Sequence, residues 1–484
     1  MNICVVSREV YPFVKAGIGV YVYHLCQLLK SKGHDVYLIT DNHDEICSNE
    51  VFKGINVRVV ESRTPINKEI FSNYNLFYSQ NVYQTLKTLS NEVKLDIVEF
   101  SDYFGEAYFT LLEKKINGFL SETPVVLKCH TPLYECLLAA HQSIEGMEDI
   151  VVQEDFCIQN ADVLCAISHT LANQIKKRLS ILKPIQVLLN PLGLDEVKLS
   201  QYVKGQPKTI LYVGKLQYLK GTDLLIRAAL ENLKNGLDFK VVLIGQDIDN
   251  HKQSLMDMIP KEFQLNFEFL GFANREDVLR AFNYAYISVF PSRWEGLSNV
   301  CIEAVTNGCP LILSDAGGLI ELKNFGDFGL YFPSENLEIL TERLKTILEQ
   351  EELRQVYANH CYEQSTVFLN DNIYDTLIAF YNEAKNNLYK VKKNRQIQDV
   401  LYENFNHSKE LNIELYAEVL RLNHEIEVRE QQYEQLSLTN MQLQKQLSEL
   451  TMKKLNPKNL EGLYSVKTLP YGSHRLKKRN KSND

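Results

Sequence analysis

The sequence predicts an α/β fold built from two doubly wound parallel sheets in series. Short runs of β-branched and apolar residues alternate with helical stretches, and this alternation stops near 192–207 before starting again. Alternating strands and helices indicate a parallel sheet that is covered on both faces. The chain has 484 residues, which is more than one hydrophobic core usually serves, so several domains are expected.

The first series of strands is expected at Asn2–Val6, Asp35–Thr40, Asp96–Phe100, Pro124–His130 and Ile185–Asn190. A helix near Val20–Ser31 separates the first two, and Gly33 is a plausible C-terminal stop for it. The second series is expected at Thr209–Val213, Lys240–Ile244, Phe267–Leu270, Ile287–Phe290, Pro310–Ser314 and Leu330–Phe332. We therefore assign 1–195 to the first domain and 196–367 to the second, with a crossover helix at about 368–388 completing the first. Two such units place a ligand cleft at the carboxyl edges of the strands.

Composition excludes some function classes. A net charge of −9 argues against a protein that binds nucleic acid over its whole surface. The ten cysteines form no CxxC pair, which suits a reducing cytoplasm. The N-terminus has the pattern of a buried strand rather than a signal peptide, and no apolar run approaches the roughly 20 residues of a spanning helix. We expect a cytoplasmic protein that at most contacts the inner face of a membrane.

The C-terminal part changes composition at about residue 391, where a heptad pattern begins. We predict a helical coiled coil at 391–453 that joins two copies in parallel, because leucine at d with β-branched residues at a favours two strands. A lone amphipathic helix packed on the globular body, or a coil that recruits another protein, is the alternative. A basic, disordered tail is expected at 454–484. The seam residues are Leu415, Val419, Leu422, Ile426, Leu436, Asn440, Leu443, Leu447 and Leu450.

Two glutamates mark the most informative segment. Glu295 follows a predicted strand and Glu303 lies in the next helix, so a helical rise of 1.5 Å per residue separates them by roughly 12 Å. That is about the distance from a hexose, across a diphosphate, to a ribose. Gly296, Leu297 and Ser298 are expected to open the helix and offer free N–H groups to the diphosphate. Taken alone, a surface glutamate and a charge near a helix N-terminus explain the pattern equally well.

Three further segments contain candidate catalytic or substrate-binding residues. Lys215 and Lys220 flank a turn after a predicted strand, where two cations suit the charge of a departing diphosphate. Lys15 and Gly17 precede the first helix, in a segment too far from its strand for a dinucleotide fingerprint. His130 ends a strand at the predicted cleft edge. Solvated lysines and a structural histidine are the alternatives for these positions.

The segment from Glu295 to Glu303 resembles the E-x7-E motif of retaining family-4 glycosyltransferases, which have the GT-B fold of two facing Rossmann-like domains. The resemblance covers about residues 1–385 and recurs in order at several sites. It implies that Glu295 lies beside the transferred sugar and that Glu303 binds the ribose hydroxyls.

The other motifs follow the same family with departures. Val213–Gly221 looks like the G-R-x4-K-G segment, with Lys215 at the arginine and Lys220 at the lysine, so the bidentate fork of arginine is lost. Lys15 to Gly19 is similar to the G-G-x-G loop that approaches the donor diphosphate. Alanine replaces its first glycine, which places the close approach at Gly17. Lys15 is similar to the lysine before this loop in bacterial glycogen synthases.

The expected function is therefore transfer of a hexose, with retained configuration, from an NDP-sugar to a glycan, lipid-linked or protein acceptor. The resemblance makes Glu295, Lys220 and His130 the catalytic residues, the last by touching the transferred sugar. Asp247-Ile-Asp249 is formally a metal-binding DxD, but lysines and a helix N-terminus already suit the diphosphate, so we expect neither metal nor cofactor. The alternatives are a catalytically inactive scaffold that acts through the coiled coil, and an NDP-sugar epimerase. The sequence does not name the donor nucleotide, the sugar, the acceptor or the linkage.

Overall fold

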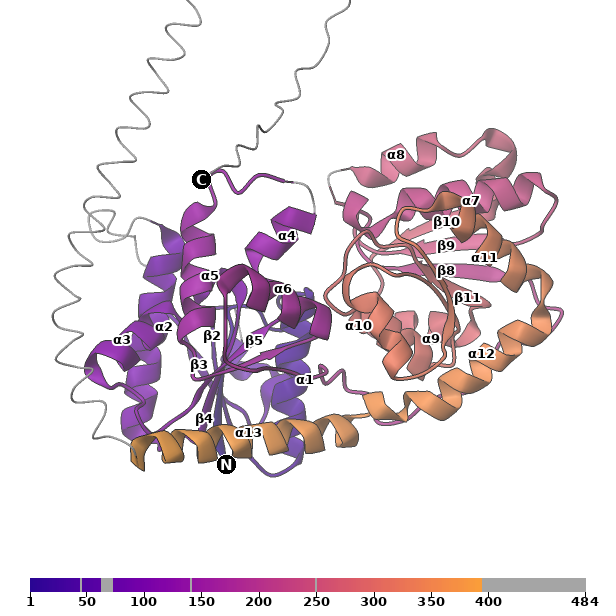
Figure 1. The fold of residues 1–484 in the computed structure, drawn as a ribbon. Coiled ribbons are helices and arrows are strands. Elements are labelled where there is room, and N and C mark those ends of the chain that lie inside the picture. Colours follow the sequence, from indigo (N-terminus) through magenta and orange to yellow (C-terminus); the bar gives the residue numbers. More distant parts are fainter. Residues whose placement is uncertain (44–45, 62–72, 140–141, 249, 394–484) are drawn as a thin grey trace, which may run out of the picture. The chain divides into compact units, whose positions relative to one another are not determined.

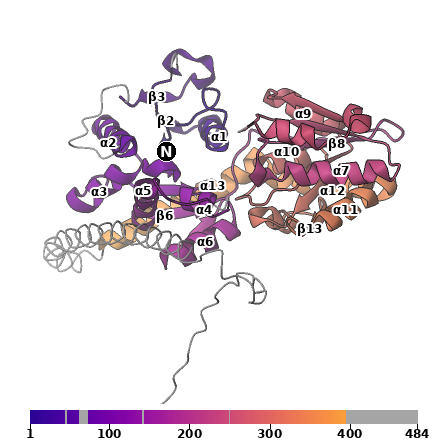
Figure 2. The same ribbon diagram turned by 90° about the horizontal axis from the view of Figure 1, so that it is seen from above.

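The computed structural model describes residues 1–43, 46–61, 73–139, 142–248 and 250–393 (Figure 1). The predicted coiled coil lies outside the described residues except for 391–393, and the basic tail lies wholly outside them. Two parallel sheets with helices on their faces confirm the predicted α/β fold class (Figures 1 and 2).

The first sheet, within the described part of the chain, has seven strands in the order β3-β2-β1-β4-β5-β6-β7, and neighbouring strands are parallel. The strands are β1 (Asn2–Val6), β2 (Asp35–Thr40), β3 (Asn56–Val59), β4 (Ile97–Ser101), β5 (Val125–Cys129), β6 (Val163–Ala166) and β7 (Ile185–Val187). Its helices are α1 (Gly17–Ser31), α2 (Tyr74–Glu92), α3 (Tyr108–Asn117), α4 (Leu133–Ala139), α5 (Glu148–Asn160) and α6 (His169–Leu179), with 3₁₀ turns η1 (Ile46–Ser48), η2 (Glu50–Phe52) and η3 (Tyr103–Gly105).

The second sheet, counted over the same described residues, has six parallel strands in the order β10-β9-β8-β11-β12-β13. They are β8 (Thr209–Val213), β9 (Lys240–Ile244), β10 (Phe267–Gly271), β11 (Ile287–Phe290), β12 (Leu311–Ser314) and β13 (Gly329–Phe332). The helices are α7 (Thr222–Lys234), α8 (His251–Asp257), α9 (Arg275–Tyr284), α10 (Asn299–Thr306), α11 (Leu337–Glu349) and α12 (Glu351–Gln364), with 3₁₀ turns η4 (Tyr218–Lys220), η5 (Lys261–Asn266), η6 (Gly317–Asn324) and η7 (Ser365–Phe368).

Two strands of the first sheet, β3 and β6, are absent from the sequence-based prediction, which was wrong there. Both have four residues, the same length as β11, β12 and β13, which the sequence did predict. β3 is an edge strand with alternating exposed positions, and its NVRV sequence has the polarity of a loop. Strand β4 also begins one residue later than predicted, at Ile97.

Local chemistry explains where several helices begin. The side chains of Ser168, Asn274 and Asn336 each accept a backbone N–H from the first turn of α6, α9 and α11. Such N-caps satisfy donors that have no partner inside a helix. Short polar residues just after a strand or turn therefore mark where each of these helices begins.

The last described helix, α13 (Asn370–Lys393), returns to the first sheet. Leu377, Phe380 and Tyr381 belong to the same buried cluster as residues of β1 and α1, and α13 is drawn in orange below the first sheet in Figure 1. The Tyr381 hydroxyl donates a 2.6 Å hydrogen bond to the fully buried carboxylate of Glu99 in β4. This polar contact ties the end of the described chain to the middle of the first sheet.

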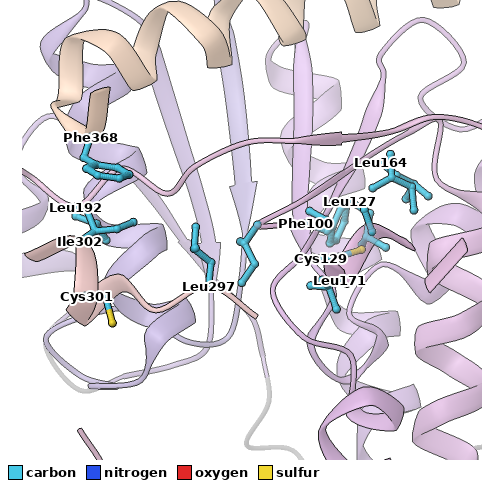
Figure 3. Packing of buried hydrophobic residues seen from close by; sticks show 14 of the residues in the cluster. Phe100, Leu127, Cys129, Leu164, Leu171, Leu192, Leu297, Cys301, Ile302 and Phe368 are labelled. Atoms are coloured by element: carbon cyan, nitrogen blue, oxygen red, sulfur yellow. The ribbon is translucent and has the colours of Figure 1, made fainter. Parts of the chain in front are cut away.

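The core of the first sheet consists of strand residues that are buried on both faces, as a parallel sheet requires. Every residue of β4 and β5 is buried, and Figure 3 shows Phe100 of β4 with Leu127 and Cys129 of β5 in one cluster. No helix of the described residues is long and apolar enough to span a bilayer.

Candidate functional site

The two sheets each have a switch point where the strand order reverses, between β1 and β4 and between β8 and β11. Ligands of open α/β sheets bind at the carboxyl ends of the strands beside such a point. The segments that follow β1, β5, β8 and β11 contain all the candidate site residues except Glu303, which lies farther along in α10. Strand topology therefore gathers the sequence-predicted residues at the carboxyl edges of both sheets.

The turn that carries Lys220 is held against the segment that carries Glu295. Gly221 has φ +65°, and a Cβ there would lie 1.9 Å from the carbonyl oxygen of Pro291, so only glycine fits. Arg293 donates to both carboxylate oxygens of Asp223 in α7, at 2.8 and 2.9 Å. This bidentate pair and the glycine contact bring the two loops together.

Lys220 and Glu295 form an ion pair at this junction. Lys220 Nζ lies 2.5 Å from Glu295 Oε1, and the two side chains are 21% and 17% exposed. The Ser292 hydroxyl lies 3.4 Å from the same carboxylate oxygen. Partial exposure leaves both groups accessible to a ligand, so the cation and the carboxylate can each exchange this contact for one with a substrate.

Two contacts hold the backbone of the Glu295 loop in place. The Gly318 N–H donates a 2.7 Å hydrogen bond to the Glu295 carbonyl oxygen. A Cβ on Gly296 would lie 3.0 Å from both the His130 carbonyl oxygen and Thr131 Oγ1. The loop after β11 therefore packs directly on the end of β5, which carries His130.

His130 is buried and stays neutral near pH 7. Its side chain packs on the ring of Tyr21 with centroids 4.6 Å apart. Burial, with the charge of Lys128 as the second cause, holds the pKa of His130 well below its usual range. Among the described residues, none provides a hydrogen-bond partner for His130 Nε2. The ring is thus available as a neutral hydrogen-bonding group rather than as a cation.

Two buried carboxyl groups support the backbone around His130. Asp102 Oδ2 accepts the N–H groups of His130 at 3.0 Å and Thr131 at 3.1 Å. Glu154 accepts backbone N–H groups of η3 and α4. Burial raises the pKa of Asp102 to about 7 and that of Glu154 to about 8, with the charge of Asp102 adding to the latter. Asp102 therefore holds the backbone around His130 in place.

Glu303 is paired with an arginine that the sequence motifs did not indicate. Its carboxylate lies 2.8 Å from Arg275 Nε, at the first residue of α9. Arg275 also donates to the carbonyl oxygen of Leu192. Burial raises the pKa of Glu303, and the charge of Arg275 opposes the shift. A carboxylate and a guanidinium side by side offer both an acceptor and a donor to a polar ligand.

The segment after β1 has a different geometry from the predicted loop. Gly17 is the first residue of α1, and a Cβ there would meet nothing within 4 Å, so the protein itself does not require glycine. Gly19 is the constrained position, because its Cβ would lie 2.4 Å from the Val14 carbonyl oxygen. Lys15 is exposed, and its Nζ lies 4.4 Å from the ring centre of Phe272.

Glu9 is a further charged residue in this segment, and no motif drew attention to it. Its carboxylate accepts the Gly19 N–H, and the exposed Lys215 contributes to its electrostatic environment. Burial raises the pKa of Glu9, with the charge of Glu106 as a second cause and that of Lys215 in opposition. A carboxylate therefore lies at the N-terminal turn where a diphosphate was expected to approach.

The helix after Glu295 begins later than predicted. Helix α10 starts at Asn299 with Ser298 as its N-cap residue, so Gly296 and Leu297 lie in the preceding loop. The distance between Glu295 and Glu303 that was derived from helical rise assumes a continuous helix. It does not hold for the residues before α10, because they are not helical. The loop forms because Gly296 is needed for close packing on β5, a contact that local sequence does not reveal.

Asp247 of the formal DxD accepts the Lys252 N–H at 2.9 Å, and Asp249 lies outside the described residues. The aspartate thus has a local partner in the first turn of α8. Among the described residues, no group of three or more histidine, cysteine, aspartate or glutamate side chains is arranged to hold a metal ion.

Comparison with known families agrees with this arrangement. Residues 16–196 match the family described as Glycosyltransferase Family 4, and residues 196–364 match Glycosyl transferases group 1. The chain belongs to the family-4 glycosyltransferases. The two matches meet at residue 196, between the two sheets.

Individual relatives of this glycosyltransferase are distant in sequence. An uncharacterized glycosyltransferase of Methanocaldococcus jannaschii is 24% identical over 74% of this chain and 92% of its own length. A glycogen synthase of Mycobacterium tuberculosis is 25% identical over 76% and 90%. The structure of sucrose-phosphate synthase from Thermosynechococcus elongatus superposes with a TM-score of 0.61 at 18% identity, covering 79% of this chain and 98% of that one. This likeness shows the GT-B fold.

Four charged residues near the candidate site were not indicated by sequence reasoning: Glu9, Arg275, Arg293 and Glu321, whose carboxylate accepts the backbone N–H groups of His169 and Thr170. Arg275, Arg293 and Glu321 each contact a partner distant in the sequence, so no local spacing marks them. Arg293 offered the one usable signal, since it stands two residues before Glu295 in the most informative segment.

Proposed function

We propose that this family-4 glycosyltransferase moves a hexose from an NDP-sugar to a glycan, lipid-linked or protein acceptor, with retention and without a metal ion. The observation that carries the proposal is the Lys220–Glu295 pair, 2.5 Å apart, together with the packing of the Glu295 loop against the strand end of His130. We assign the cation to the diphosphate and the carboxylate to the sugar hydroxyls, and the loop of that carboxylate packs on the backbone of a neutral histidine.

The proposed reaction breaks the bond between the anomeric carbon and the diphosphate oxygen and forms one from that carbon to the acceptor oxygen. The acceptor's proton passes to the departing phosphate oxygen on the same face of the sugar, which retains the configuration. Lys220 and Lys215 stabilise the charge that develops on the diphosphate. The positive charges of the two lysines offset the negative charge of the diphosphate, so no metal ion is needed for this step.

We assign the binding roles from the family resemblance, and the contacts of each residue support them. Glu295 accepts hydrogen bonds from sugar hydroxyls after Lys220 turns to the diphosphate. Glu303 and Arg275, 2.8 Å apart, face the ribose. The buried, neutral His130 donates or accepts a hydrogen bond at the sugar. Because its ring carries no charge, it does not attract the acceptor electrostatically. The N–H groups at Asn299 and Val300, just after the Ser298 cap, extend the diphosphate site.

A panel of UDP-, GDP- and ADP-sugars tests the proposal. We expect one donor to raise the melting temperature and to be slowly hydrolysed, and Glu295→Ala to reduce hydrolysis and transfer by on the order of 100-fold. Glu338→Ala, which removes an exposed carboxylate of α11 in the same domain, is the matched control and keeps full activity.

Product stereochemistry and metal removal test the finer claims. NMR of the product should show the anomeric configuration of the donor, and a chelator should leave the rate unchanged. An inverted product contradicts the same-face mechanism. Conversion of an NDP-sugar to its epimer in the absence of acceptor would favour the epimerase alternative, and the absence of stabilisation by every donor would favour an inactive scaffold.

A further inference from the structure

The carboxylate of Glu321 lies at the amino end of helix α6. It accepts the His169 N–H at 2.7 Å and the Thr170 N–H at 2.5 Å. Glu321 belongs to η6 after β12 of the second sheet, whereas α6 follows β6 of the first. The side chain is 9% exposed, so the contact is shielded from water.

This contact completes the first turn of α6. The Ser168 hydroxyl already accepts the Leu171 N–H at 3.2 Å. Glu321 takes the other two first-turn donors, which have no partner within a helix. A negative charge is also favoured there by the helix dipole. A third hydrogen bond between α6 and η6, 3.3 Å long, runs from Thr170 Oγ1 to the Gly317 carbonyl oxygen.

The amino end of η6, at Gly317 and Gly318, holds the loop that carries Glu295. The Gly318 N–H donates to the Glu295 carbonyl oxygen, and a Cβ on Gly317 would lie 2.1 Å from that oxygen. A Cβ on Gly318 would lie 1.7 Å from the Gly296 carbonyl oxygen and 3.0 Å from Ser168 Cβ. The amino end of α6, η6 and the Glu295 loop are therefore packed without room for a side chain between their backbones.

We propose that Glu321 is a positioning residue for the transfer reaction. By docking η6 on the amino end of α6, it holds the Glu295 carboxylate at a set place relative to the end of β5. The claim rests on the proposed function in that Glu295 acts on the sugar. Glu321 itself touches neither of the proposed substrate-binding lysines, so its loss should disturb geometry more than donor affinity.

Two full-length variants, Glu321→Gln and Glu321→Ala, test this in enzyme kinetics with the donor found above. We expect Glu321→Ala to lower kcat on the order of 10-fold or more, because small displacements of catalytic groups are costly. The donor KM should change less than threefold. Glu321→Gln keeps one acceptor oxygen and should fall between Glu321→Ala and the wild type. Glu338→Ala is again the control.

Hydrogen exchange measured by mass spectrometry gives a readout that does not need activity. In Glu321→Ala we expect faster exchange in peptides of α6 and also in peptides of the Glu295 loop and α10. Faster exchange in α6 alone would mean that Glu321 only caps a helix, and would overturn the proposal. An unchanged kcat in both variants would overturn it as well.

The two proposals fail in distinguishable ways. If the wild-type chain transfers no sugar from any donor, the proposed function fails, while coupled exchange in α6 and the Glu295 loop still supports the mechanical link. If Glu321→Ala does not fold, Glu321→Gln supplies both measurements. Its exchange in the Glu295 loop then decides: a rise supports the proposal and wild-type exchange there contradicts it.

Discussion

Replacing Asp102 by Asn should remove part of the pH dependence of stability. Asp102 Oδ2 accepts two N–H groups, from His130 and Thr131, and Oδ1 has no hydrogen-bond partner among the described residues. Asn can therefore keep the accepting oxygen in place. Burial raises the pKa of Asp102 from 3.8 to about 7, so the folded protein holds a proton that the unfolded chain has released.

The sign follows from this upward shift. Stability from this group is fully present below the unfolded pKa of 3.8 and is lost as the pH rises through about 7. Between about pH 5.5 and about pH 8, the wild type should lose about 2 kcal/mol of unfolding free energy from this one carboxyl. Glu154 shifts in the same direction, to about 8, and the charge of Asp102 contributes to that shift. Removing Asp102 therefore also lowers the pKa of Glu154 and flattens the profile further.

Urea unfolding followed by circular dichroism at these two pH values measures the effect. The variant should lose about 2 kcal/mol less than the wild type on going to the higher pH. Asp257→Asn, at an exposed position of the second sheet's helices, is the control and should follow the wild type. Equal losses for Asp102→Asn and the wild type would refute a carboxyl that titrates near neutrality.

Two further substitutions test how the site is built. Gly221→Ala should cost about 2 kcal/mol or more and weaken donor binding, because its left-handed backbone and a carbonyl at 1.9 Å exclude a Cβ. Thermal unfolding should show a smaller loss, about 1 kcal/mol, for Gly236→Ala, which has φ +86° but nothing within 4 Å of a Cβ. Tyr381→Phe should cost about 1–3 kcal/mol, because it removes a donor to the buried Glu99. Tyr374→Phe, on the same helix but partly exposed beside a histidine, should cost less, and similar losses for the two tyrosines would contradict the role of the buried network.

The fold was largely predictable because parallel strands are buried on both faces and appear as short apolar runs. β1, β2, β8, β9 and β11 lie where the pattern places them. β3 was missed because its NVRV sequence has the polarity of a loop, and β6 was missed although it is as long as the predicted β11. The start of α10 was misplaced because the Glu295 loop is shaped by a contact with β5. Local propensity cannot report a contact with a distant strand.

For the candidate site, sequence alone predicted which loops carry its residues. Glu295, Lys220 and His130 each follow a strand end, and alternation of strands and helices sends such ends to one edge of a sheet. Only the tertiary structure decided how these residues are held. The bonds from Glu321 to α6, from Gly318 to Glu295 and from Asp102 to His130 join segments that are distant in the chain. The physical reason is that the free energy of such contacts depends on burial and distance in space, and spacing along the chain specifies neither.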